Sequence, residues 1–403
     1  KANMKDGIVQ RGKNSFAFIV ELGRDAKGKR IQKWVTVRGT RKDAKRERDK
    51  MRVQKEEGSY VVPTNETLGE FLTAWLVHVK ATVSGKTFEE YERIVTRYMI
   101  PRLGHVSLKK LNATLIQSYY LWLQGKTDDV RTDGKGALSA RTVIHHHVLL
   151  KNALARAVKW RRIPRNPMED DAVIAPKAQD SEARALTKEQ TAKVIELSRP
   201  KRYYIAVLMA LFTGMRRGEI CALKWKNVDL DKGSLLVVET LEEVKSRVDG
   251  MPQSVLTFKP PKTKRGRRKI ALPSIAVEEL RKHKAQQAKE KLMMGPGYQD
   301  DGLVFCNVDG TPYRPNLLTV NYASLIRRAP AKYGLQGTNF HSLRHTHATR
   351  LLEQGVHIKV VSERLGHATV SITLDVYSHV SEGIQEDAAL KVDATLRAAM
   401  GTV

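Results

Sequence analysis

The residue types that could act on a phosphate gather near the end of the chain, between His341 and His379. His341 and Arg344 are three residues apart, so on a helix they would lie on one face. His367 follows a Leu-Gly pair, and Tyr377 comes after a segment rich in Thr, Ser and Val. A guanidinium can hold phosphate oxygens, imidazoles can move protons, and a phenol can serve as a nucleophile. This set of side chains therefore predicts chemistry on a phosphodiester.

Each of these residues also has an ordinary structural interpretation. A single tyrosine is most often a packing residue with a polar tip, and a single helical histidine is more often structural than catalytic. His341 and His345 have the i, i+4 spacing of a metal-binding pair. No Glu follows His341 as in a zinc-protease motif, and Arg344 would place a positive charge beside the cation. The sequence therefore favours a site without a metal ion.

The elements that must position these side chains can be placed from the apolar pattern. Apolar residues at helical spacing follow Arg344, and Gly355 ends the helix that they predict. A second short helix is predicted over residues 358–365, with Gly366 at its end. His367 is therefore expected at the C-terminus of a helix.

Composition limits the class of protein. The chain has 403 residues, a formal net charge of +28 and a pI of about 10.0. The length predicts roughly two or three domains, and the charge indicates a polyanionic partner, with nucleic acid favoured over an anionic membrane surface. The apolar run 205–212 is too short to span a bilayer, and we see no apolar leader. Cys221 and Cys306 form no CxxC pair, so a reducing cytoplasm is expected.

Residues 1–62 are expected to form a small basic module with a β-sheet and a helix. Alternating Phe16 and Phe18 predict one strand, residues 34–37 predict a second, and residues 40–57 have a basic helical pattern. The segment between the strands nearly matches a phosphate-binding loop, but Arg30 replaces the Ser or Thr that would hold magnesium. A hairpin turn is therefore favoured.

This module suits DNA, because strands can enter a major groove while cations hold phosphates. A solvated charged face would have the same composition. The cations of the module that we predict to bind DNA are Arg11, Lys13, Lys29, Arg30, Lys33 and Arg38.

Residues 63–176 are predicted to form an all-α domain that holds DNA. The helical patterns cover residues 68–81, 86–99, 112–123 and 139–160. Pro101 and Gly104 separate the second helix from the third. The cations predicted to bind DNA here are Arg141, Lys151 and Arg156.

Residues 177–403 are predicted to form a mixed, mainly α domain, after a proline-containing linker. A buried helix is predicted over residues 203–212, which lead into the sequence TGMRRGE, and a strand is predicted over residues 235–238. A basic hairpin is predicted over residues 262–273, and further helices over 275–291 and 317–332. The fold class is therefore α+β and multidomain, with a small sheet and helix first, an all-α domain second and a mixed domain third.

On these motifs the chain resembles the tyrosine recombinases, or phage integrase family. The motifs occur in the family's order: Thr213, Gly214, Arg216 and Glu219; Lys262 in Pro-Lys-Thr-Lys; His341 and Arg344; Leu365-Gly366-His367; and Leu374-Asp-Val-Tyr377-Ser-His. The order of domains looks like that of integrases from lysogenic phages and conjugative transposons. There an arm-site module precedes a core-site domain and a catalytic domain, here residues 1–62, 63–176 and 177–403 with a C-terminal tail.

The resemblance implies a site-specific recombinase that integrates and excises a mobile element. Tyr377 would attack a DNA phosphodiester, form a 3′-phosphotyrosine and free a 5′-hydroxyl, and a hydroxyl of the partner strand would then attack that link. Arg216 and Arg344 would carry the phosphate charge, so no metal ion, ATP or other cofactor is expected. His341 would be the base and His367 would hydrogen-bond the phosphate.

Lys262 and Lys264 are both candidates for the acid that protonates the leaving oxygen, and Lys262 is preferred. Both are predicted to lie on one strand face of the hairpin. Lys264 and Arg267 are also predicted to hold the DNA backbone.

The partners implied by the resemblance are double-stranded DNA with core and arm sites, three further copies of the chain, and an accessory bending or excision factor. The setting would be a bacterial cytoplasm, with no membrane. Two other functions remain open at this point: a type IB topoisomerase-like enzyme, and a non-catalytic DNA-binding repressor or architectural protein.

Overall fold

The computed structural model describes residues 7–24, 28–56, 65–127, 136–178, 184–245, 254–377 and 382–400. The side chain of Tyr377 lies outside this description. Contacts divide the chain into two compact units, residues 1–180 and 181–403. Among the described residues, no helix combines the length and the apolar character needed to cross a membrane.

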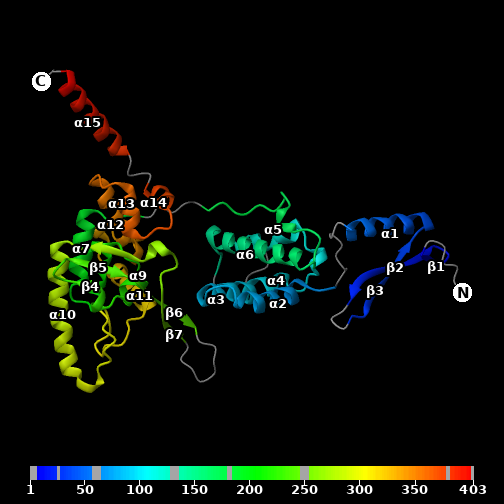
Figure 1. Cartoon of the computed structure of the whole chain (residues 1–403), viewed down its shortest axis with the longest axis horizontal. Helices are drawn as coiled ribbons and strands as arrows, with labels where there is room; N and C mark the ends of the chain where they lie inside the picture. The colour runs from blue at the N-terminus through cyan, green and yellow to red at the C-terminus, as the bar shows by residue number, and fades with distance from the viewer. Residues whose placement is uncertain are drawn as a thin grey trace. The chain divides into compact units, whose positions relative to one another are not determined.

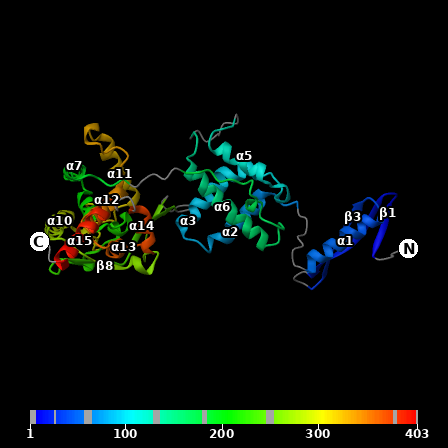
Figure 2. The ribbon, with the colours of Figure 1, turned by 90° about the horizontal axis from the view of Figure 1, so that it is seen from above.

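The first unit begins with a three-stranded antiparallel sheet in the order β1-β2-β3. Its elements are β1 (Ile8–Gly12), β2 (Ser15–Arg24), β3 (Arg30–Arg38) and α1 (Arg41–Glu56). In both views α1 lies along one face of the sheet (Figures 1 and 2). Phe16, Phe18 and Val20 alternate toward that face and pack with Ala44 of α1. The predicted sheet and helix are therefore present, and the tip of the predicted turn, residues 25–27, lies outside the described residues.

The rest of the first unit is helical. Its helices are α2 (Leu68–Lys80), α3 (Gly85–Ile94), α4 (Ile100–Leu103), α5 (Ala113–Leu123) and α6 (Ala140–Lys159). They enclose one apolar core, in which Phe71, Ile116, Tyr119 and Leu150 are almost fully buried. The helix starts follow from polar caps: Asn112 accepts a hydrogen bond at the start of α5, and Ser139 does the same at the start of α6.

Pro101 does not end the second helical segment, contrary to the sequence prediction. Between α3 and α4, residues 95–99 form a π turn in which Ile100 N–H donates to the Val95 carbonyl. The chain then continues as α4 with Pro101 in its first turn, where a missing N–H is tolerated. Gly104, as predicted, follows the last helical residue.

The second unit contains the remaining elements. They are α7 (Lys188–Ser198), α8 (Tyr204–Thr213), α9 (Arg217–Ala222), β4 (Val228–Asp229), β5 (Ser234–Val237), β6 (Thr240–Lys245), β7 (Ser254–Lys259), β8 (Arg268–Ala271), α10 (Ser274–Met294), α11 (Pro315–Arg328), α12 (Phe340–Glu353), α13 (Ile358–Leu365), α14 (Val370–Tyr377) and α15 (Glu382–Met400). Helix α8 is apolar on nearly every side, and it packs against α7, α9, α10 and α12. An all-round apolar helix must be buried, so α8 is the centre of this unit.

The second unit has two small sheets instead of the predicted 262–273 hairpin. Strands β4, β5 and β8 form one antiparallel sheet, and β6 pairs with β7 in a separate hairpin that stands out in Figure 1. Residues 260–267 form the turn between β7 and β8, with a short 3-10 helix at 264–266. Lys262 and Lys264 therefore lie in a turn, and the prediction that they share a strand face is wrong.

Candidate active site

Helix α12 positions the first pair of predicted site residues. The Asn339 side chain accepts hydrogen bonds from the backbone N–H groups of His341 (2.9 Å) and Ser342 (3.2 Å), which fixes the start of the helix. His341 lies in the first turn and is exposed, whereas Arg344, one turn further on, is only 3% exposed. A buried guanidinium needs partners within the protein.

Those partners are at the C-terminal end of α13. A helix leaves its last carbonyl groups without intrahelical partners and carries partial negative charge there. Three guanidiniums from separate parts of the chain bind three consecutive carbonyls: Arg268 Nε donates to Arg364 O (2.7 Å), Arg344 Nη2 to Leu365 O (2.8 Å), and Arg216 Nη2 to Gly366 O (3.2 Å). Arg216 and Arg344 are thus brought together at the helix end that precedes His367.

Two glycines allow this close approach. Gly366 ends α13 with φ +68°, and a Cβ there would lie 2.9 Å from Nη1 of Arg268. Gly214 has φ +65°, and its Cβ would lie 2.6 Å from Cδ2 of Leu365. The Gly214 carbonyl also accepts a 2.6 Å hydrogen bond from Arg344 Nη1. A side chain at Gly366 would press on Arg268, and one at Gly214 would press on Leu365 at the helix end and on His347.

Glu219 is the counter-ion of the arginine cluster. It is 3% exposed, and its carboxylate accepts from Arg216 Nη1 (2.9 Å), from the Arg216 backbone N–H (2.9 Å) and from Arg268 Nη2 (2.8 Å). Burial acts to raise the pKa of Glu219, but the hydrogen bond and charge of Arg268, with the charge of Arg216, outweigh it and lower the pKa below its ordinary value. Glu219 is therefore ionised and braces Arg216, whose side chain remains 42% exposed.

The imidazoles of the site are neutral near pH 7. The rings of His341 and His345 meet edge to face, with centroids 4.7 Å apart. Although His341 is exposed as a residue, desolvation of its imidazole, followed by the charges of His345, Arg344 and Arg216, lowers its pKa to about 4. Desolvation and the charges of Arg344 and Arg216 also lower the pKa of His367 to about 4. A neutral imidazole can accept a proton, and an arriving phosphate would oppose this lowering by supplying negative charge.

His367 also connects the site to α14. Its Nδ1 lies 2.8 Å from Oγ1 of the buried Thr373 on that helix. Tyr377, the last residue of α14, follows one helical turn beyond Thr373. Helix α14, which ends at the predicted nucleophile Tyr377, is therefore hydrogen-bonded through Thr373 to the segment after α13 that also holds the two arginines.

The turn that carries the lysine candidates is fastened to the same segment. Arg265 Nη1 donates to the Ala368 carbonyl (2.9 Å), directly after His367. Lys262 and Lys264 are both exposed on this turn, as is Arg267. The structure thus brings the turn to the site, and the choice of Lys262 over Lys264 stays a prediction.

The cations of the N-terminal module divide between the two faces of the sheet. The Arg11 guanidinium lies 4.7 Å from the ring centroid of Trp34, which is 44% exposed on the face opposite α1. Arg38 follows Trp34 on that open face, whereas Lys33 pairs with the buried Val20 on the face that α1 covers. The remaining cations predicted to bind DNA are exposed: Lys13, Lys29, Arg30, Arg141, Lys151 and Arg156.

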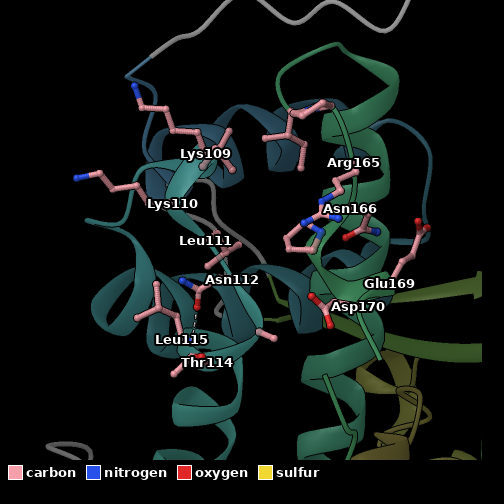
Figure 3. A pocket seen from close by; sticks show the side chains of 15 residues that line it. Lys109, Lys110, Leu111, Asn112, Thr114, Leu115, Arg165, Asn166, Glu169 and Asp170 are labelled. Atoms are coloured by element: carbon pink, nitrogen blue, oxygen red, sulfur yellow. Dashed lines mark hydrogen bonds between the residues drawn. The ribbon is translucent and has the colours of Figure 1, made fainter. Parts of the chain in front are cut away.

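A hollow in the helical part of the first unit was not predicted. Figure 3 shows Lys109 and Lys110 on one side of it and Glu169 and Asp170 on the other, with Asn112 at the start of α5 between them. Its lining carries both signs of charge and none of the predicted catalytic residues. It therefore forms no part of the candidate site.

Sequence reasoning also missed Arg268 and His347. Arg268 and Ile270 are buried on β8 while Lys269 and Ala271 are exposed, so the period-two pattern could have shown that Arg268 points inward. His347 is fixed between two partners: Nδ1 lies 2.8 Å from the Leu211 carbonyl and Nε2 accepts from Arg364 Nε (3.0 Å). Because a carbonyl can only accept, the proton of this ring is on Nδ1.

Neither cysteine competes with Tyr377 as a nucleophile. Both Cys221 and Cys306 are buried, and burial raises the pKa of the Cys221 thiol to about 12. Among the described residues, no group of three or more His, Cys, Asp or Glu side chains could hold a metal ion.

A pair of arginines held by a helix end, with neutral imidazoles beside it, is an arrangement that can bind a phosphodiester. Comparison with known proteins specifies the class of protein. The model of the phage integrase family matches residues 184–383, and the model of the phage integrase N-terminal SAM-like domain matches residues 67–130.

Curated relatives match over nearly the whole chain. A tyrosine recombinase XerC-like protein of Caldanaerobacter subterraneus is 30% identical over 388 residues, covering 93% of this chain and 95% of that protein. An integrase of Streptomyces ambofaciens is 28% identical over 377 residues, covering 93% of this chain and 92% of that protein. The chain belongs to the phage integrase family and is a tyrosine site-specific recombinase.

Solved structures agree with this fold. The integrase of transposon Tn1549, in complex with a circular intermediate DNA, has a TM-score of 0.65 at 20% identity and covers 81% of this chain and 99% of that one. A lambda integrase dimer bound to a core site has a TM-score of 0.53 at 16% identity, covering 94% and 96%. The predicted fold class is thereby confirmed.

The neutral His347 should make the second unit less stable in mild acid. His347 is 8% exposed, and desolvation followed by the charge of Arg364 lowers its pKa from 6.5 to about 4. Between those values the unfolded chain binds a proton that the folded chain excludes, so stability rises with pH across this window. The neutral His347 contributes roughly 3 kcal/mol to the free energy of unfolding. This contribution is complete above about pH 6.5 and is lost as the pH falls toward about 4.

Both buried cysteines belong to the second unit, so their reaction with a thiosulfonate reagent in urea measures its unfolding. The unfolding free energy should fall between pH 7 and pH 4.5 in the wild type. The His347→Asn variant, which keeps an N–H donor, should show a shallower slope around its own lower stability. Equal slopes for the two proteins would rule out His347 as a source of the acid sensitivity.

Proposed function

We propose that this recombinase is the integrase of a mobile element, and that it exchanges DNA strands through a 3′-phosphotyrosine on Tyr377. The observation that supports this most is the junction at the end of α13. Two guanidiniums are held there, His367 follows directly, and the bond from His367 to Thr373 holds α14, the helix that ends at Tyr377, against this junction. Integrases of a transposon and of a phage share the fold.

The proposed reaction conserves phosphodiester bonds. The Tyr377 oxygen attacks the scissile phosphorus, the bond to the 5′-oxygen breaks, and a 3′-phosphotyrosine and a free 5′-hydroxyl result. A 5′-hydroxyl from the partner DNA then attacks the phosphotyrosine and releases the phenol. Arg216 and Arg344 stabilise the charge that develops on the non-bridging oxygens.

Protons must move at two atoms. A tyrosine with an ordinary pKa near 10 is a weak nucleophile at neutral pH, so its proton needs an acceptor. His341 is neutral at that pH and is assigned this role, with His345 packed against its ring. Lys262, on the turn fastened to Ala368, is assigned to protonate the leaving 5′-oxygen, and His367 to hydrogen-bond the phosphate.

We assign double-stranded DNA as the partner of both units. The open face of the β1-β2-β3 sheet, with Arg11, Trp34 and Arg38, would bind arm sites, and the helical domain would bind core sites. The relatives solved on DNA include a lambda integrase tetramer on a Holliday junction, which supports four copies of this chain on two duplexes. An accessory bending or excision factor remains part of the proposal.

Replacing Tyr377 with Phe should abolish the covalent adduct. The substitution removes one oxygen and keeps the ring, so folding and DNA binding should persist. A nicked suicide duplex should trap the wild type on a 3′ end, and peptide mapping should place the link at residue 377. Tyr333→Phe, in the same unit but outside the site, is the matched control and should still be trapped. An adduct with Tyr377→Phe would show that another residue attacks.

Deleting residues 1–60 should separate arm binding from cleavage. The module has its own apolar core, so its removal should leave the helical and catalytic parts folded. Cleavage of a short core-site duplex should be retained, and affinity for a distal arm site should fall. Unchanged affinity for both DNAs, measured by fluorescence anisotropy, would refute the assignment of the sheet.

The tail should be needed for the tetramer. Helix α15 exposes Leu390 (67%), Val392 (58%) and Leu396 (54%), which can form a contact surface for another copy. A chain that ends at Ser381 should bind a core site yet fail to form four-copy complexes in mass photometry. Strand exchange should fall with it, and the Arg397→Ala control should assemble normally. Tetramers of the truncated chain would exclude this role for α15.

A further inference from the structure

Arg268 is a buried arginine, and the hydrogen bonds of its guanidinium go to residues of the second unit. Its side chain is 6% exposed, so it has no open path to DNA. Nη2 and Nη1 form a fork on the two Glu219 oxygens at 2.8 and 3.2 Å, and Nε donates to the Arg364 carbonyl at 2.7 Å. Nη1 also donates to the Gly266 carbonyl at 3.0 Å. Such a planar fork is specific to arginine.

The partner of this fork is the carboxylate that holds Arg216. Glu219 Oε1 accepts from Arg216 as well as from Arg268, so one negative charge is shared by two guanidiniums. These three groups together carry one net positive charge, which is available to a phosphate in addition to the charge of Arg344. With Arg268 replaced by a neutral residue, Glu219 would neutralise Arg216 and draw its remaining donors inward.

Arg268 also joins the two backbone segments on either side of the site. Gly266 ends the short 3-10 helix of the lysine turn, and Arg364 belongs to the end of α13 just before His367. The close approach requires Gly366, because a Cβ there would lie 2.9 Å from Arg268 Nη1. The same guanidinium thus sets both how much of the Glu219 charge is left to compensate Arg216 and the spacing of the surrounding segments.

We propose that Arg268 is a positioning residue for strand cleavage, which acts by sharing the Glu219 carboxylate so that the charge of the Arg216 guanidinium is only partly compensated and stays directed at the scissile phosphate. The proposal rests on the proposed function. The loss of one charged donor to a developing oxyanion typically slows a reaction by about 100-fold or more. Replacing Arg268 should have an effect of this size although it does not touch DNA.

The test compares two scissile phosphates in the same nicked duplex. One is an ordinary phosphodiester, and in the other a methyl group replaces a non-bridging oxygen, which removes the negative charge that Arg216 must balance. Single-turnover cleavage by Arg268→Met should fall about 100-fold on the phosphodiester and less than about tenfold on the methylphosphonate. A residue that only supports the fold would lower both rates equally.

Arg364→Met is the matched control. Arg364 is also partly buried and donates to the Phe212 and Ala271 carbonyls and to His347, but it makes no hydrogen bond to Glu219 that would link it to Arg216. Arg364→Met should lower the cleavage rate by the same factor on both substrates. Arg268→Lys keeps the charge without the fork. Its cleavage rate should fall about tenfold on the phosphodiester and by a smaller factor on the methylphosphonate.

Thiol protection of Cys221 and DNA affinity report folding in every variant. If the Met variant is unfolded, the comparison in Arg268→Lys decides. Equal losses on the two substrates, or no loss on the phosphodiester, overturn this inference alone when the wild type forms its Tyr377 adduct. A wild-type chain that forms no adduct overturns the proposed function and the inference together.

Discussion

The fold of the second unit depends on how the partial negative charge and the unpaired carbonyls at the C-terminal end of α13 are compensated. A helix end inside a protein leaves carbonyls that must be paired, and here three arginines pair them. Three guanidiniums so close together would repel one another without a buried anion. Glu219 supplies that anion and reaches two of them. The helix end, the arginines and the carboxylate therefore stabilise one another as a unit.

This arrangement explains why the site tolerates an exposed arginine beside buried ones. Arg344 and Arg268 are held on several sides, whereas Arg216 keeps part of its guanidinium at the surface. Desolvation, together with the positive charge collected in this way, lowers the pKa of the nearby imidazoles, which stay neutral at physiological pH. Desolvation and the electrostatic field that would attract a phosphate thus both keep His341 able to accept a proton.

Much of this unit could be predicted from the sequence, because local signals agreed with the final fold. Helix α13 has the predicted bounds, since its apolar spacing and Gly366 act within a few residues. Helix α14 was not predicted as a helix, because its Thr, Ser and Val residues have low helix propensity and it is held by α13 and by the bond from Thr373 to His367. Local signals could not show that contact.

The site residues followed the same rule. The types and order of Arg216, His341, Arg344 and His367 could be read from the sequence, and the structure brings them together. The hydrogen-bond partners of the arginines could not be read from the sequence, because each partner is distant along the chain. Arg344 binds the carbonyl of Gly214, and Arg268 binds the carboxylate of Glu219. The turn at Lys262 was misplaced for a related reason, since the long hairpin before it obscured where β7 ends.

The most direct test of the account is a structure of Tyr377→Phe on an uncleaved core-site duplex. We expect the non-bridging oxygens of the scissile phosphate within hydrogen-bond distance of both Arg216 and Arg344. The bonds from these arginines to Gly366 and Leu365 should be kept, with Glu219 between Arg216 and Arg268. A scissile phosphate bound elsewhere, with Arg216 turned fully onto Glu219, would contradict the claim that the α13 end is the phosphate site.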